Sequence, residues 1–80
     1  MNLTELREDE VARVSCLLDP GSTVGLRLAG AGVLPGTEIR LLQRRPAYVI
    51  RLAFSELALD HETATHIRVR REGIDSPVSE

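Results

Sequence analysis

The sequence predicts a mainly β fold, a small and partly open antiparallel barrel of five short strands. A chain of 80 residues allows one domain and one core. Apolar side chains recur at alternate positions in several short segments, which is typical of half-buried strands. The segments lie too close together for the crossover helices of a parallel sheet, and closing the sheet would protect its edges. One helix is expected between the first two strands and a short helical turn before the last.

The first strand is expected over residues 11–18. Its alternating apolar positions are Ala12, Val14, Cys16 and Leu18. Leu17 breaks this alternation. The pattern predicts that Cys16 is a buried, unreactive thiol. Residues 3–10 are expected to form a short lead-in whose leucines pack on the core.

A helix is expected next, with Ser22 as its N-cap after the turn residues 19–21. Its apolar positions follow the spacing i, i+4 and i+7: Val24, Leu28 and Ala31. Gly25 and Gly30 each weaken a helix interior by about 1 kcal/mol relative to alanine. This helix must therefore be held in place by packing.

A turn made of Gly32, Pro35 and Gly36 is predicted to fix the angle between the helix and the second strand. Gly32 suits the left-handed position at a helix end. Pro35 presets its own φ, and Gly36 tolerates a positive φ in the same turn. These three are interpreted as residues that determine the fold.

The remaining elements follow in order. They are strands over 37–43, 48–54 and 57–59, a helical turn over 61–65 capped by Asp60, and a strand over 67–70. The side chains expected inside are Val14, Ile39, Leu41, Leu57, Leu59, Ile67 and Val69. Residues 1–72 are taken as the domain. Residues 73–80 have little apolar content and are expected to be a disordered tail.

The charge balance argues against nucleic acid as a partner. Ten basic and twelve acidic residues give a net charge of −2 at pH 7, whereas domains that bind phosphate backbones are usually basic. Tyr48 and Phe54 are the only aromatic side chains, so a platform for stacking bases is not expected. With one cysteine, no basic leader and no long apolar run, the chain is expected to be cytoplasmic without inserting into a membrane.

No catalytic, metal or cofactor site is predicted. His61 and His66 are five residues apart, which on a helix turns their imidazoles about 140° from each other. Two histidines that share a metal on a helix are usually four residues apart. The sequence also shows no nucleophile–base motif and no complete phosphate-binding loop.

Two blocks of the sequence resemble the ferrous iron transport protein A (FeoA) family. One runs from Arg27-Leu28 through a glycine to Pro35-Gly36-Thr37 and Ile39; the other is Leu57–Asp60 followed by Ala64, Ile67 and Val69. The resemblance covers roughly residues 3–70 and implies an SH3-like barrel. It also implies a non-catalytic accessory protein that binds the FeoB-type membrane GTPase transporter. The alternative is a regulatory module like the SH3-like C-terminal domain of metal-dependent repressors, and weak self-association is left open.

Outward-facing arginines are the remaining candidates for function. If Arg40, Arg51, Arg68 and Arg70 face outward from adjacent strands, they form a basic stripe on an acidic protein. Arginine and aromatic side chains often dominate the energy of protein interfaces. The predicted partner interface is therefore Leu34, Arg40, Tyr48, Arg51 and Phe54.

Overall fold

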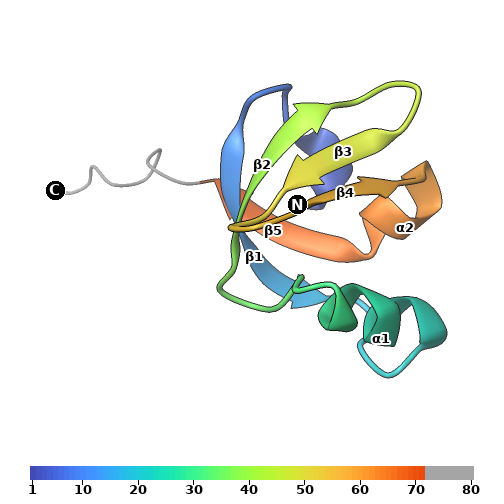
Figure 1. The fold of residues 1–80 in the computed structure, drawn as a ribbon. Coiled ribbons are helices and arrows are strands. Elements are labelled where there is room, and N and C mark those ends of the chain that lie inside the picture. Colours follow the sequence, from blue (N-terminus) through green and yellow to red (C-terminus); the bar gives the residue numbers. More distant parts are fainter. Residues whose placement is uncertain (72–80) are drawn as a thin grey trace, which may run out of the picture.

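The computed structural model describes residues 1–71 and confirms the predicted barrel (Figure 1). In chain order its elements are η1 (Leu3–Glu5), β1 (Val11–Leu17), α1 (Thr23–Gly30), β2 (Glu38–Gln43), β3 (Tyr48–Arg51), β4 (Glu56–Leu59), α2 (His61–Thr65) and β5 (Ile67–Arg71). The strands form one antiparallel sheet in the order β4-β3-β2-β1-β5. The tail predicted over residues 73–80 lies outside the described residues.

Strand β1 contains an irregularity that the alternating pattern did not predict. Its register with β5 shifts between Val14 and Cys16, which reverses the side-chain alternation as a bulge does. Leu17 therefore points into the core and is 7% exposed, whereas Cys16 is exposed. The prediction of a buried Cys16 thiol is wrong for this reason, and Leu18 also lies at the surface.

Helix α1 begins as predicted, at the Ser22 N-cap. The Ser22 hydroxyl accepts a hydrogen bond from the Gly25 N–H at 3.0 Å. Gly25 itself is buried, and a Cβ there would lie 2.3 Å from the Asp19 carbonyl oxygen. Only glycine permits this close approach of the helix to the preceding loop. The helix lies at one end of the barrel (Figure 1), where Leu28 anchors it in the core.

Strand β3 is shorter than predicted. It ends at Arg51, and the following residues turn back toward β4, with the Leu52 N–H donating to the Ser55 carbonyl at 2.8 Å. Phe54 therefore lies in a hairpin turn and not in a strand. The predicted strand over 57–59 gains one residue at its start, Glu56.

The core is aliphatic, as the composition requires. Of the side chains expected inside, all are buried except Leu57, which is partly buried against the others. The core also takes in Leu3 and Leu6, both 0% exposed, so the lead-in does pack on the barrel. No helix among residues 1–71 has the length and apolar character needed to span a membrane.

Two arginines tie the N-terminal segment to the barrel. Arg44 Nη1 donates to the carbonyl oxygens of Thr4, at 2.9 Å, and Leu6. Arg71 makes an ion pair with Glu10, and its Nη2 donates to the Glu5 carbonyl at 3.2 Å. These guanidinium groups satisfy carbonyls that the short η1 helix leaves without partners.

Candidate interaction surface

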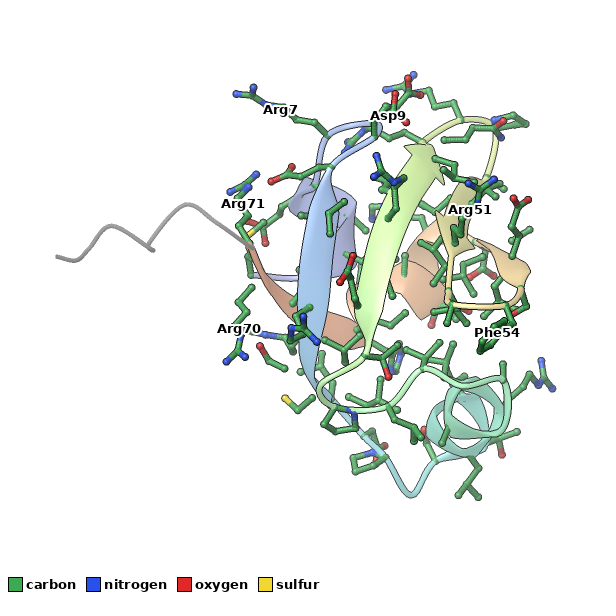
Figure 2. The ribbon with its side chains drawn as sticks, turned by 60° about the vertical axis from the view of Figure 1, so that its left-hand side comes forward. Arg7, Asp9, Arg51, Phe54, Arg70 and Arg71 are labelled. Carbon is green, nitrogen blue, oxygen red and sulfur yellow. The ribbon has the colours of Figure 1, made fainter. Side chains whose placement is uncertain are left out.

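Three of the predicted interface residues lie over β2 and the β3–β4 hairpin. Arg40 and Arg51 are paired in register on adjacent strands, and both are exposed. Figure 2 shows Arg51 and Phe54 on the same side of the molecule. A hollow of about 320 Å³, lined in part by Arg40, Arg51 and Ala53, opens beside them. We refer to Arg40, Arg51, Phe54 and Glu56 as the hairpin surface.

Both guanidinium groups of the hairpin surface have polar partners within the chain. Arg51 donates through Nε and Nη2 to Glu56 Oε2, at 3.2 and 2.8 Å. Arg40 Nη1 donates to the Asp9 carbonyl at 3.1 Å. The Arg51–Glu56 side chains are about half exposed, so their pair contributes little to stability. Its exposure leaves the planar guanidinium able to exchange Glu56 for a carboxylate on another protein.

Phe54 is the most exposed large apolar side chain of residues 1–71. Its exposed fraction is 100%, at the turn that joins β3 to β4. A fully hydrated phenyl ring gains nothing for the fold, whereas burying it against a partner would be favourable by about 1.5–3 kcal/mol. An aromatic ring beside an arginine is the combination that most often anchors an interface.

Tyr48 is part of the core, which corrects the expectation that its ring is available to a partner. Its exposed fraction is 8%. The hydroxyl lies 3.2 Å from His61 Nδ1, and the Arg44 guanidinium carbon lies 5.8 Å from the ring centroid. The first residue of β3 thus packs inward, because α2 and the segment around Arg44 cover it.

Leu34 lies on a separate segment, the turn between α1 and β2. It is 48% exposed, and its carbonyl accepts a hydrogen bond from the Thr37 N–H at 3.0 Å. Gly32 and Gly36 adopt positive φ values of 100° and 90° in this turn. The turn therefore has the backbone geometry that its glycines suggested.

The predicted basic stripe is divided into two groups. Arg68 and Arg70 are exposed on β5, at the opposite edge of the sheet from the β3–β4 hairpin. Arg70 and Arg51 accordingly lie on different sides of the molecule (Figure 2). Between the groups, Glu38 forms an ion pair with Arg13 at 3.7 Å. A continuous stripe from Arg51 to Arg70 is not what the fold presents.

The two histidines occupy different environments near α2. His61 is exposed and contacts Tyr48 through Nδ1, whereas His66 is half-buried and its Nδ1 has no hydrogen-bond partner among residues 1–71. No three side chains of the kinds that bind metals come together within residues 1–71. The Thr63 side chain, and then its backbone N–H, lower the pKa of the Asp60 carboxyl through hydrogen bonds. That carboxylate serves as the N-cap of α2.

From the sequence, Leu52 and Ala53 were placed in a strand and only a short bend was expected at Ser55-Glu56, so Glu56 was not assigned to the interface. The segment 52–55 contains no glycine, proline, asparagine or aspartate, and Ser55 is its one residue of a type common in turns. A signal was present in the charges, since Arg51 and Glu56 have opposite charge and are symmetric about the turn. Opposite charges placed directly across two strands stabilise a hairpin.

The family model of the FeoA domain matches residues 1–71 of the chain. No curated protein sequence matches this chain. Among solved structures, the FeoA of Stenotrophomonas maltophilia, an SH3 domain protein complexed with zinc and suggested to be a ferrous iron transport activating factor, is 25% identical. Its TM-score is 0.79, over 88% of this chain and 89% of that one.

Two further structures resemble the chain. Iron(II) transport protein A of Clostridium thermocellum is 28% identical with a TM-score of 0.82, over 91% of this chain and 46% of that one. IdeR of T. acidophilum is 21% identical with a TM-score of 0.83, over 90% of this chain and 34% of that one. At that identity the likeness to IdeR shows a shared fold alone.

Proposed function

Because this chain belongs to the FeoA family, we propose that it is a non-catalytic, cytoplasmic accessory protein of ferrous-iron transport that binds the FeoB-type membrane GTPase transporter. The family and its SH3-like fold are the premise. Contact with that transporter, the site of contact and the absence of catalysis are the proposal. The domain in this view comprises residues 1–72.

The observation that carries the proposal is the hairpin surface, and above all the fully exposed Phe54. An accessory protein needs an anchor that its own fold does not use. Phe54 supplies apolar area, and Arg51 beside it supplies a charge whose present partner, Glu56, is itself half exposed. Leu34 and Arg40 are secondary members of the proposed interface, whereas Tyr48 is left out because it is buried.

The alternative, a regulatory module of the metal-dependent repressor type, has no specific site in its favour. Its support is the fold shared with IdeR over about a third of that protein. Among residues 1–71, moreover, no cluster of metal-ligating side chains would connect such a module to a metal. The transporter-binding proposal has both the family and an exposed anchor behind it.

The test measures binding of the purified protein to the FeoB-type transporter of the same organism, held in lipid nanodiscs. Phe54→Ser should weaken binding by about 1–3 kcal/mol. The matched control is Leu26→Ser, which removes another exposed apolar side chain, on α1, and should leave binding unchanged. Equal affinities of wild type and Phe54→Ser would refute the hairpin surface, and absence of any binding would refute the partner.

A charge variant tests the arginine separately. Arg51→Glu places a second carboxylate opposite Glu56 and should weaken transporter binding, whereas Arg45→Glu, on the β2–β3 connection, should not. Isolated protein should show no GTP hydrolysis of its own. Hydrolysis by the protein without the transporter would contradict the non-catalytic assignment.

A further inference from the structure

A groove of about 260 Å³ separates α1 from β4. One wall is a single stripe of the helix, with Val24, Arg27, Leu28 and Ala31 at the spacing i, i+3, i+4 and i+7. The opposite wall is formed mainly by β4, including Leu57 and Ala58. Apart from Arg27, these named side chains are apolar. Asp60 and Thr63 also line the groove, and residues 1–71 leave its apolar surface uncovered.

The β4 wall is an edge of the sheet, since among the described strands β4 pairs with β3 alone. The hydrogen bond from the Leu52 N–H to the Ser55 carbonyl makes these two residues a hydrogen-bonded pair of the hairpin, which fixes which of the later pairs are hydrogen-bonded. Hydrogen-bonded pairs alternate in antiparallel strands, so Leu57 directs its backbone groups toward β3. Ala58 then directs its N–H and C=O outward, where no backbone group of residues 1–71 bonds to them.

Arg27 gives the groove an unpaired positive charge. It is exposed, and none of its guanidinium nitrogens makes a hydrogen bond or ion pair with another of residues 1–71. The groove also contains the Asp60 carboxylate, but that group accepts the Thr63 N–H at 2.8 Å as the cap of α2. Asp60 keeps its own negative charge, so the groove holds one charge of each sign. The positive one, the Arg27 guanidinium, pairs best with a carboxylate.

We propose that this groove binds an extended peptide segment of a partner protein, which adds a strand to β4, inserts an apolar side chain against α1 and presents a carboxylate to Arg27. Strand addition uses the free N–H and C=O of Ala58, and the groove supplies side-chain specificity. The volume of about 260 Å³ is below the usual range for small-molecule pockets, which begins near 300 Å³. It suits one apolar side chain next to a backbone that continues along the edge.

This inference goes beyond the proposed transporter function and does not depend on it. The groove lies between α1 and β4, whereas Arg51 and Phe54 precede β4 in the hairpin. A partner held at the hairpin surface and a peptide held in the groove would be separate events. The two proposals therefore fail separately.

The experiment selects ligands from a random library of linear heptapeptides displayed on phage, with the whole chain immobilised. Enriched peptides should have apolar residues at alternate positions and an Asp or Glu. A synthetic copy of the most enriched peptide, titrated into ¹⁵N-labelled protein, should shift the amide signals of Ala58 and of α1. The signals of the hairpin turn around Phe54 should stay in place.

Variants then assign the contacts. Arg27→Glu should lower the affinity for the selected peptide at least tenfold. Arg27→Lys should keep most of this affinity, and the control Arg45→Glu should keep all of it. Ala58→Pro removes an N–H that the fold does not use, so it should abolish peptide binding in a folded chain, as confirmed by its thermal melt. If Ala58→Pro does not fold, the Arg27 variants alone decide whether the peptide binds in the groove.

Three outcomes would overturn the proposal. The first is that no peptide is enriched over an empty support. The second is that enriched peptides shift the hairpin turn instead of the groove, or bind Arg27→Glu as well as wild type. The third is a concentration-dependent dimer in sedimentation whose formation shifts the Ala58 amide, because the occupant would then be a second copy of this chain.

Discussion

The two sides of the barrel are held by different kinds of contact. On the side of η1 and β5, the closed side, contacts join residues far apart in the chain: Arg44 bonds to Thr4 and Leu6, and the Val69 N–H donates to the Met1 carbonyl at 2.9 Å. On the α1 side, the hydrogen bonds that residues 22–33 make within the described part of the chain all stay within residues 19–37.

This difference explains why the groove lies where it does. Long-range contacts pull the N-terminal segment against β5 and leave Leu3 and Leu6 with no exposed surface. Local hydrogen bonds shape α1 but do not draw it onto β4, so its apolar stripe is only partly covered. The comparison predicts that the closed side is part of the cooperative core and that α1 can loosen separately.

The largest expected effect is on the closed side. Leu6→Ala removes a fully buried side chain and should lower the free energy of unfolding by about 2–5 kcal/mol, measured by urea denaturation. The control is Leu26→Ala on α1, where 64% of the residue is already exposed and the change should stay within about 0.5 kcal/mol. A cost for Leu6→Ala near that of the control would show that the lead-in is not part of the core.

The next effect concerns the α1 side. Gly25→Ala places a Cβ against the backbone of Asp19 and Pro20, which cannot move aside as a side chain would, and should destabilise by about 1–3 kcal/mol. The strain should appear locally, so amide hydrogen exchange should accelerate in α1 and much less in β5. Equal acceleration in both elements would contradict the separation of the two sides.

Local patterns in the sequence were enough to predict the fold. The alternation in residues 37–43 and 67–70, the Ser22 cap and the glycines of the α1–β2 turn are all short-range signals, and the element order follows from them. Two details needed contacts from elsewhere. The bulge in β1 depends on its pairing with β5, and the end of β3 depends on a turn without glycine or proline.

The candidate sites were less predictable for the same reason. Tyr48 was expected at the surface because its burial results from α2 and Arg44, which no local pattern indicates. Phe54 was singled out as a rare aromatic, but its exposure depends on the hairpin turn. Gly25 looked like a weak point in a helix, whereas the close approach of Asp19 makes it necessary.

A smaller effect, dependent on pH, is expected from the ion pair on the closed side. Burial alone would raise the pKa of Glu10, but hydrogen bonds from the Arg7 N–H and from Arg71, together with the positive charges of both, lower it from its usual 4.5. Because the pKa of Glu10 is lower in the folded state, its ionised form stabilises the fold at pH values above the unfolded-state pKa. This contribution is lost as the pH falls through the folded-state pKa.

Glu10→Gln should therefore cost about 1 kcal/mol at pH 7. The difference from wild type should shrink as the pH falls below about 4.5, measured by urea denaturation across the range. Glu38→Gln is the control, since the ion pair of Glu38 with Arg13 spans 3.7 Å and the Glu38 side chain is 60% exposed. A cost at Glu10 that stays constant down to pH 3 would show that Arg71 does not hold the ionised form.

The smallest effect has the opposite sign and tests the α1 side once more. Gly30 ends α1, and a Cβ there would meet nothing within 4 Å. Its φ lies outside the left-handed region, so alanine fits the backbone and reduces only the freedom of the unfolded chain. Gly30→Ala should stabilise the protein by about 0.4–1 kcal/mol, read from thermal melts. Gly32→Ala is the matched control, because its φ of 100° makes the same change unfavourable. If Gly30→Ala destabilised the fold, α1 would be packed more closely at its end than an open groove allows.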